Sequence, residues 1–549
     1  MKKQKNQADV FIRVEQWCSN NQKALIFTIL SIFTLMSMLL FNLRISEGGD
    51  DSTYIIRAVN FINDGAYPSF QGPLYPMFLS LFVSLFGIKL GVLKLSSFAL
   101  MLFCLWFIYK HFKGRVPYTL LFATLLLVSV SSYFTYFSSQ TYSEALFLVL
   151  QLPVIALVFK LIDNKTNTFN WKTVALLSLA IFAGYLTRTV GVGTLIAVMV
   201  FLALDKRYKE AGAILGGFIV LFGFFLIIKS SIWQIPMFDD GQASTLIYKH
   251  PYQLDKGKET IGGFITRFID NSNLYLSKHF IKMLGLRAAG PTAVYGFITV
   301  LLYAIFAYAT AKAFKKNKYL LFVAIYLMTM LGITFTALQK LWDQYRLIIP
   351  FFPFMVMTVL YGLWELSQLK KSSLLKYLFL VLIGISFIGS AKQSFTKIDL
   401  LTLRKNLKGD LYEGYTDDWR HFLSMSEYAG KKLPEQSYVA ARKPNMARIY
   451  ADGKKFYGIY RFDTNDPDKL LQRLKDKKVT HVIMASLRKN PRVNNGQTIN
   501  TIQRYLYIIS KKYPEVFKLE YQIGKIEPAF LFRVDYKAAK SIESNNQGN

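Results

Sequence analysis

Apolar residues fill the first 390 or so positions of the chain in repeated runs of about 16 to 22 residues, with short polar segments between them. A helix of this length crosses the hydrocarbon core of a bilayer. We predict spans at 24–42, 91–109, 117–132, 143–162, 173–187, 189–204, 211–229, 291–311, 319–338, 346–364 and 374–391. The pattern therefore predicts a polytopic α-helical membrane protein with about eleven transmembrane helices.

One apolar run, at 73–88 (PLYPMFLSLFVSLFGI), does not fit as a span. It is short, carries Pro73 and Pro76 at its start, and as a span it would place the basic cluster at 110–115 outside. We therefore predict a first external loop at 43–90 that carries two interfacial helices, over 52–63 and 73–88. An ordinary short tilted span at 73–88 is the alternative.

The pattern changes at about residue 393, where the spans stop and charged residues alternate with short apolar runs. Strands are predicted at 437–441, 455–460, 479–485, 516–523 and 529–536, and amphipathic helices near 417–431, 466–477 and 498–512. This order predicts a soluble α/β domain over 393–549, to which the sequence assigns no chemistry. Residues 1–392 then form the membrane module, with a second, long external loop at 230–290.

The formal net charge of +32 is distributed unevenly, because Lys and Arg gather in short loops between alternate spans. Examples are Lys110, Lys113 and Arg115, and the basic cluster at 312–318. Cytoplasmic loops carry such an excess, so we place these loops, and the N-terminus, in the cytoplasm. The C-terminal domain is then extracytoplasmic and the protein lies in the cytoplasmic (inner) membrane, and the charge does not predict nucleic-acid binding.

The pair Asp50-Asp51 follows the first predicted span directly and opens the segment GGDDSTYIIRAVNFINDGAYPSFQGPLYPMFLSLF. Two adjacent carboxylates at a membrane face indicate chemistry on a substrate that lives in the bilayer. The alternative is that one of them only caps the helix starting near Ser52, since Asp is a favoured N-cap residue.

Four segments together resemble a known family. GDDSTYIIRAVNFINDGAYPSFQGPLYPMFLSLFVSLFG is similar to the first loop of the GT-C glycosyltransferases, in particular the protein O-mannosyltransferase and aminoarabinose transferase group (glycosyltransferase family 39-like). YFTYFSSQTYSEALFLVLQL resembles the second external loop of that group, GYLTRTVGVGTLIA its Leu-Thr-Arg turn, and DQYRLIIPFFPFM its Tyr-Arg entry to a late span. The four matches occur in order, and the resemblance covers most of residues 24–391.

The resemblance implies an integral membrane glycosyltransferase, a hexosyl- or pentosyltransferase, with a GT-C-like module. Such an enzyme moves a sugar from a polyprenyl-phosphate donor to a lipid, glycan or protein acceptor on the outer face of the membrane. Two positions depart from the family pattern: the acidic pair is Asp50-Asp51 where relatives usually have Asp-Glu, and the residue before Pro73, often His or Lys in relatives, is Gly72. The second departure removes one candidate cation for a phosphate.

Transfer from a polyprenyl phosphate needs a base for the attacking group and positive charge for the departing phosphate. An Asp carboxylate is ionised at neutral pH unless it is strongly desolvated. Following the resemblance, we assign the base to Asp50, with Asp51 as its backup or orienting partner. Glu144, at the outer end of the fourth predicted span, is the third catalytic candidate, although a carboxylate is also expected there from the helix dipole.

Arginine offers a planar fork that binds phosphate oxygens in pairs. Arg346 and Arg188 lie in two of the matched motifs and are the first candidates for the phosphate, with Lys340 and Arg287 behind them. The alternative for Arg346 is a surface ion pair with Asp343, three residues earlier. The further candidate substrate-binding residues are the tyrosines of the first and last motifs, Tyr54 and Tyr345.

The sequence predicts no cofactor and no metal site. The five histidines show no ligand spacing, and we expect each at the surface. Asp239-Asp240 in the long loop could bind a divalent cation, but the adjoining Gly241 favours a turn. No nucleotide-binding loop of the G-x-x-x-x-G-K or G-x-G-x-x-G type is present, as expected for a lipid-phosphate donor.

Two other functions stay open from the sequence. A transporter or flippase of lipid-linked sugars would place ionisable groups inside the spans, and its halves would repeat, whereas these span interiors are nearly free of charge and no repeat is visible. A non-catalytic membrane scaffold would have no reason to gather acidic and basic residues at one face.

Overall fold

The computed structural model describes residues 10–68, 72–164, 168–237, 242–287, 293–368, 373–462, 464–489, 497–499 and 501–539. Its contacts divide the chain into two compact units that are interleaved in sequence. The first unit comprises residues 1–41, 61–85 and 91–399, and the second comprises 42–60, 86–90 and 400–549. Residues that follow the first long helix are thus part of the same unit as the C-terminal region.

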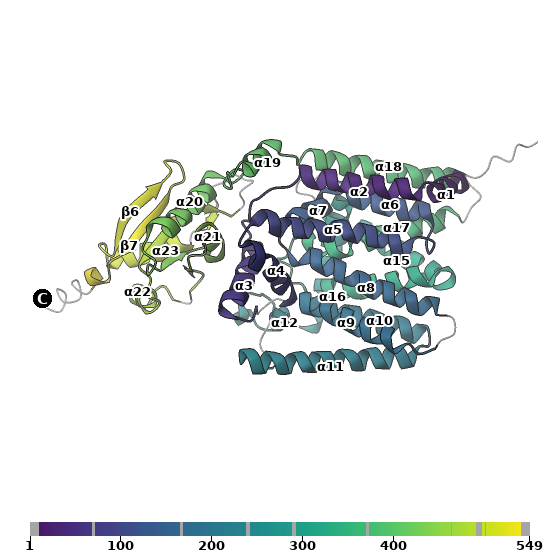
Figure 1. Cartoon of the computed structure of the whole chain (residues 1–549), viewed down its shortest axis with the longest axis horizontal. Coiled ribbons are helices and arrows are strands. Elements are labelled where there is room, and N and C mark those ends of the chain that lie inside the picture. Colours follow the sequence, from purple (N-terminus) through teal and green to yellow (C-terminus); the bar gives the residue numbers. More distant parts are fainter. Residues whose placement is uncertain are drawn as a thin grey trace, which may run out of the picture. The chain divides into compact units, whose positions relative to one another are not determined.

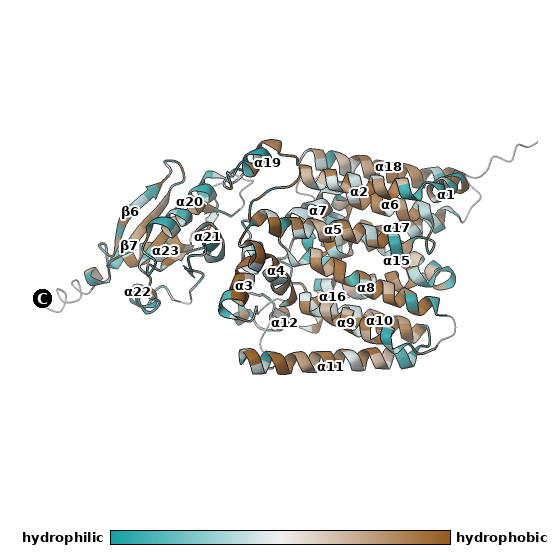
Figure 2. Cartoon of the chain, in the orientation of Figure 1, coloured by the Kyte–Doolittle hydropathy of each residue, from teal (hydrophilic) through white to brown (hydrophobic). Residues whose placement is uncertain are grey.

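The first unit is a bundle in which the long helices run side by side (Figure 1). Its helices are α1 Val10–Asn20, α2 Gln22–Leu39, α4 Leu74–Phe86, α5 Leu90–Phe112, α6 Tyr118–Val130, α7 Ser132–Tyr136, α8 Ser143–Asp163, α9 Trp171–Thr187, α10 Val192–Leu204, α11 Tyr208–Trp233, α12 Gln242–Leu246, α13 Ile261–Ser272, α14 Ile281–Met283, α15 Gly296–Lys316, α16 Lys318–Ala337, α17 Phe352–Ser367 and α18 Ser373–Phe395. In Figure 2, helices such as α8 and α11 are apolar along most of their length.

Each predicted span coincides with a helix, but not every helix has the length of a span. Within the described residues, eight helices are long and apolar enough to cross a membrane, and the pair α6 and α7 makes a ninth if it counts as one bent span. The helices α9 and α10 are shorter apolar helices. The chain is therefore a multi-pass membrane protein with eight or nine candidate spans, fewer than the eleven predicted.

The bend between α6 and α7 is centred on Ser131. Ser131 is extended (φ −69°, ψ 113°), which interrupts the helix, and the two segments meet at 55°. The Ser131 hydroxyl donates to the carbonyl of Met283, 2.8 Å away, so a distant segment holds the break in place. A hydropathy pattern cannot register such a contact, which is why the sequence predicts one unbroken helix at 117–132.

Several loops predicted to be cytoplasmic meet one another in the first unit. Arg115 forms an ion pair with Asp163 at 2.6 Å, and its carbonyl accepts from the Asn317 side chain at 2.7 Å. Lys318 pairs with Asp205 at 2.5 Å. The ends of α5, α8 and α10 and the turn between α15 and α16 are thereby joined at one end of the bundle.

The second unit contains a mixed sheet with the strand order β2-β1-β3-β7-β6. Strand β1 is parallel to β2 and β3, whereas β7 is antiparallel to β3 and β6. The strands are β1 Val439–Ala441, β2 Phe456–Gly458, β3 His481–Ala485, β6 Phe517–Ile523 and β7 Ala529–Val534, with a separate pair β4 Leu487–Arg488 and β5 Thr498–Ile499. All five predicted strands are present, because alternating apolar residues mark them locally.

The second unit also contains helices: α3 Asp50–Asp64, which belongs to it as far as Asn60, α19 Leu400–Leu407, α20 Asp417–Lys432, α21 Pro444–Tyr450, α22 Pro467–Asp476 and α23 Thr501–Lys512. Helices α20, α21 and α23 pack against the strands. The core cluster includes Leu474 of α22, Ile509 of α23 and Val482 of β3. The sequence predicts α20, α22 and α23, and it misses the short helices α19 and α21.

Candidate active site

Glu144 lies in the first turn of α8, and only 2% of its surface is exposed. One guanidinium nitrogen of Arg188 is 2.8 Å from its Oε1, and Nε of Arg346 is 3.9 Å from the same oxygen. Burial of a carboxylate is unfavourable unless it is paired and hydrogen-bonded. Two arginines beside one carboxylate satisfy this requirement.

The two arginines come from segments without regular helix. Arg188 is extended (φ −148°, ψ 132°) between α9 and the turn at 189–191, and it also donates to the Ser143 hydroxyl at 3.1 Å. Arg346 belongs to the short turn Tyr345–Leu347 before α17, and its guanidinium lies 5.2 Å from the ring centre of Tyr142. Three of the four matched motifs thus place a charged residue at one cluster.

Aromatic rings adjoin this cluster. Tyr345 packs edge-on against Tyr133 and Phe137, with ring centres 4.8 and 6.1 Å apart. Lys397, just after α18, places its ammonium 3.8 Å from the ring centre of Tyr133 and donates to the Ser132 hydroxyl at 2.9 Å. Lys397 is not among the residues predicted from the sequence. Its position, a few residues after the last predicted span, could have indicated a cation at the membrane face.

Asp343 binds a neighbouring pair of basic residues. Its carboxylate is 2.5 Å from Lys278 Nζ and 2.6 Å from His279 Nε2, both in the π-helical segment Asn273–Phe280. Burial lowers the pKa of His279 to about 4, more than the adjacent Asp343 raises it, so the imidazole is neutral at pH 7. The expectation that every histidine lies at the surface is wrong for His279 and His481, which are 6% and 7% exposed.

Lys340 and Arg287 make other contacts. Lys340 pairs with Asp270 at 2.5 Å, and both side chains are largely exposed. Arg287 donates to the Ser277 carbonyl at 2.9 Å, and its guanidinium lies 4.7 Å from the Tyr295 ring centre. No described contact joins Lys340 to the Glu144 cluster.

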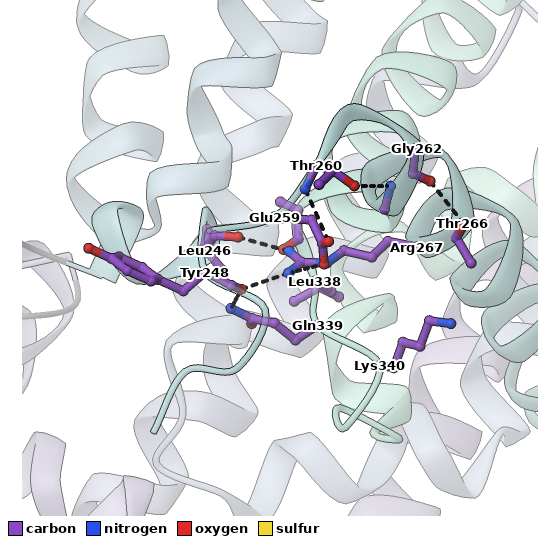
Figure 3. A network of polar contacts seen from close by, with 12 residues as sticks. Leu246, Tyr248, Glu259, Thr260, Gly262, Thr266, Arg267, Leu338, Gln339 and Lys340 are labelled. Carbon is purple, nitrogen blue, oxygen red and sulfur yellow. Dashed lines mark hydrogen bonds and ion pairs between the residues drawn. The ribbon is translucent and has the colours of Figure 1, made fainter. Parts of the chain in front are cut away.

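A second polar network, around Arg267, holds part of the long loop that was predicted at 230–290 (Figure 3). Arg267 is 1% exposed, pairs with Glu259 at 2.8 Å, and donates to the carbonyls of Leu246 and Tyr248 at 2.8 and 2.6 Å. In Figure 3 the Lys340 side chain extends away from this network. Arg267 also donates to the Ala337 carbonyl at 3.3 Å, so one buried arginine with four partners holds the loop. No local pattern in the sequence indicates this role.

Gly72 lies where the backbone of the first loop passes very close to the backbone of the Leu-Thr-Arg turn. A Cβ atom at this position would lie 2.3 Å from the carbonyl oxygens of both Leu186 and Thr187, which is far inside van der Waals contact. Glycine is therefore required by the close approach of two backbones. The cations of this region come from Arg188, Arg346 and Lys397 instead.

The acidic pair belongs to the second unit, at the start of α3. Asp51 is fully buried and accepts hydrogen bonds from Ser46 N at 2.7 Å, the Ser46 hydroxyl at 3.2 Å and Ser52 N at 2.8 Å. Asp50 is partly exposed. Asp51 thus performs the structural task, closing the turn at 46–51, and Asp50 is the more accessible carboxylate. Tyr54 is buried on the same helix.

No metal site emerges from the described part of the chain, where no three His, Cys, Asp or Glu residues gather closely enough to hold an ion. Asp239 and Asp240 lie outside the described residues.

Comparison with known proteins gives matches in structure but not in sequence. No family model matches the chain, and no curated protein matches it. The structure of ArnT from Cupriavidus metallidurans bound to undecaprenyl phosphate aligns with a TM-score of 0.53 and 12% identity, over 94% of this chain and 98% of ArnT. The apo state of the same protein gives a TM-score of 0.57 at 12% identity, over 94% and 99% of the two chains.

An archaeal oligosaccharyltransferase aligns as well. AglB from Archaeoglobus fulgidus, in complex with an inhibitory peptide and a dolichol-phosphate, has a TM-score of 0.51 and 10% identity over 94% of this chain and 75% of AglB. At these identities the likeness concerns the fold. The chain therefore has the GT-C fold of the polyprenyl-phosphate glycosyltransferases, with eight or nine candidate spans and a C-terminal domain built on a mixed sheet.

Proposed function

We propose that this protein is an integral membrane glycosyltransferase that moves a sugar from a polyprenyl-phosphate donor to an acceptor on the outer face of the cytoplasmic membrane. The fold supports this proposal, because two of its structural neighbours are recorded with undecaprenyl phosphate and with a dolichol-phosphate and a peptide. The acceptor is a lipid, a glycan or a protein.

The observation that carries the proposal is the arrangement of Glu144 with Arg188 and Arg346. Two guanidinium groups meet at this one carboxylate, and the proposed phosphate binds to them. Arginine binds phosphate oxygens through two parallel N–H groups, and such charged hydrogen bonds are about twice as strong as neutral ones. Tyr142 and Tyr345 adjoin the arginines and supply apolar surface for the lipid or sugar.

In the proposed reaction a hydroxyl or amide of the acceptor attacks the anomeric carbon of the donor sugar. The bond from that carbon to the phosphate oxygen breaks, and the polyprenyl phosphate leaves with the electron pair and an added negative charge. Arg346 and Arg188 stabilise this charge. The acceptor proton passes to the Asp50 carboxylate, which acts as general base.

The basic loops support the proposed orientation. Lys110, Lys113, Arg115 and the cluster at 312–318 carry the excess of positive charge that is typical of cytoplasmic loops. Two of these loops are joined where Asn317 donates to the Arg115 carbonyl. The N-terminus then lies in the cytoplasm and the C-terminal domain outside.

The test measures lipid-phosphate binding and sugar transfer on the purified full chain. Arg346→Met and Arg188→Met should each weaken retention of undecaprenyl phosphate in native mass spectrometry by about 10-fold or more, because each removes a charged hydrogen bond worth about 1.5–3 kcal/mol. Arg115→Met is the matched control, since Arg115 also pairs with a carboxylate and has a similar exposed fraction, 27% against 23% for Arg346.

Equal retention by all three variants would contradict the assignment of the phosphate to this cluster. Movement of a lipid-linked sugar across vesicles, with no transfer to any acceptor, would contradict the enzyme and favour a transporter.

A further inference from the structure

The segment that carries the acidic pair is bound along its length by residues from the C-terminal part of the chain. The contacts inside the second unit are Leu43 N to the Asn406 side chain at 3.0 Å, Ile45 N and O to the Tyr415 hydroxyl at 2.7 Å each, the Thr53 hydroxyl to the Asn445 side chain at 3.1 Å, and the Asn60 side chain to Arg448 at 2.7 Å. Arg44 also donates to the Gly414 carbonyl. Residues 42–60 are therefore built into the C-terminal domain.

Lys443 makes the contact nearest to the acidic pair. Its ammonium donates to the carbonyl of Glu47 at 2.7 Å and to that of Gly48 at 3.1 Å, and it faces the ring of Trp419 at 5.9 Å. Gly49 follows with a φ of +89°, a left-handed conformation that favours glycine, and leads directly into Asp50. One side chain thus fixes the two peptide units before the turn into α3.

The position of Lys443 in the domain suits this task. It lies between the end of strand β1 and the start of helix α21, on the loop that follows the carboxyl end of a parallel strand. Open α/β sheets present their binding loops at that end. Here the loop holds a segment of the same chain, residues 46–51.

We propose that the C-terminal domain positions the proposed catalytic base, and that Lys443 in its ammonium form is the positioning residue that orients Asp50. This inference rests on the proposed function. It gives the appended domain a part in the reaction, namely to hold the acidic segment in one geometry.

The charges around Lys443 explain why its protonation state matters. Burial, with a smaller contribution from the neighbouring Arg442, lowers the pKa of Lys443 to about 8, although the carboxylates of Asp50, Asp51 and Glu47 raise it. Below pH 8 the ammonium donates to the two carbonyls and offsets three acidic side chains. Above pH 8 the amine becomes neutral, and the repulsion among those carboxylates is no longer offset.

The pH dependences of stability and of activity then have opposite signs. The pKa of Lys443 is lower in the folded protein than the ordinary lysine value of 10.5, so folding favours its neutral form. Its contribution to stability therefore increases as the pH rises from about 8 to about 10.5. Transfer should instead decrease as the pH rises through about 8, because the ammonium form is the positioning form. The titration of a lysine with a merely structural role would produce no decrease in transfer near pH 8.

The experiment compares Lys443→Met and Lys443→Arg with the control Lys454→Met in the full-length protein. Lys454 also donates to backbone carbonyls, those of Pro434 and Glu435 at 2.9 and 3.5 Å, away from the acidic segment. We expect Lys443→Met to lower the turnover rate by about 10-fold or more, since a misplaced catalytic group loses much of its effect. Lys443→Arg should keep the activity within a few fold and abolish its decrease near pH 8, because arginine stays charged. Lys454→Met should match the wild type.

A second readout does not depend on transfer. Hydrogen exchange of the amides at 46–53 should accelerate in Lys443→Met and remain slow in Lys454→Met. Unchanged exchange and an unchanged pH profile in both Lys443 variants would overturn the inference. Faster exchange in a protein whose wild type transfers no sugar would overturn the proposed function instead, and faster exchange with undiminished transfer would overturn the link between the segment and the reaction.

Discussion

Two buried carboxylates, Glu144 in the first unit and Asp51 in the second, are stabilised in different ways. Glu144 is flanked by the guanidinium groups of Arg188 and Arg346. Asp51 accepts hydrogen bonds from two backbone N–H groups and the Ser46 hydroxyl, which are neutral donors. The first carboxylate is paired with cations, whereas the second is held by neutral donors. In the proposed function the arginines of the first region bind the phosphate, and Asp51 holds the turn that leads into the neighbouring proposed base, Asp50.

The largest expected effect is that of Asp50→Asn, which changes the proposed base next to Asp51. Asn caps a helix about as well as Asp, so the protein should fold, but the proton acceptor is lost. Transfer should fall on the order of 100-fold or more, the range of general-base loss, while the melting temperature stays within a few degrees of the wild type.

Because Asp51 is adjacent, the double change of Asp50 and Asp51 to Asn belongs beside each single one. A folded double variant with undiminished transfer would remove both carboxylates from the mechanism.

A smaller effect is expected for the ion pair between Glu144 and Arg188. In a double-mutant cycle of Glu144→Gln and Arg188→Met, the coupling free energy of unfolding should be about 1–2 kcal/mol, because a charged hydrogen bond at 2.8 Å joins the two side chains. Arg188 is 21% exposed, so screening by solvent keeps the value below that of a fully buried pair. Thermal unfolding in detergent measures the coupling, and additive single effects would mean that the pair contributes nothing.

The smallest expected effect concerns the neutral donors of Asp51. Ser46→Ala removes the 3.2 Å hydroxyl contact but keeps the 2.7 Å N–H contact of the same residue. The loss of unfolding free energy should be about 0.5–1.5 kcal/mol, the net value of one hydrogen bond. Ser84→Ala is the control, since the exposed Ser84 hydroxyl bonds only to its own helix. A larger loss for Ser84 than for Ser46 would contradict the role given to the turn.

The sequence predicts those helices and strands whose residues form a recognisable local pattern. The strands at 439–441 and 481–485 alternate or run apolar over a few residues, and long apolar runs mark helices such as α11. It also groups Glu144, Arg188 and Arg346, because each lies in a motif of the resembled family at a helix end, and the structure brings these three together.

What the sequence does not predict depends on residues that are far apart in the chain. Lys443 is 396 positions from Glu47, and no local pattern connects a lysine after a short strand with an acidic loop near the N-terminus. Arg267 and Lys397 are isolated basic residues in the sequence, and their partners come from other segments. The break at Ser131 likewise depends on Met283. The roles of all the predicted site residues stay predictions; they are Asp50, Asp51, Glu144, Arg346, Arg188, Tyr54, Tyr345 and Lys340.

The tight approach at Gly72 limits how this protein can be re-engineered or diverge. Since a Cβ atom there would lie 2.3 Å from two carbonyl oxygens, a lysine or histidine cannot be introduced by changing that residue alone. Such a change would require a concerted shift of two loops. The course of the backbone thus excludes a cationic side chain at position 72, and a positive charge in this region must come from another segment.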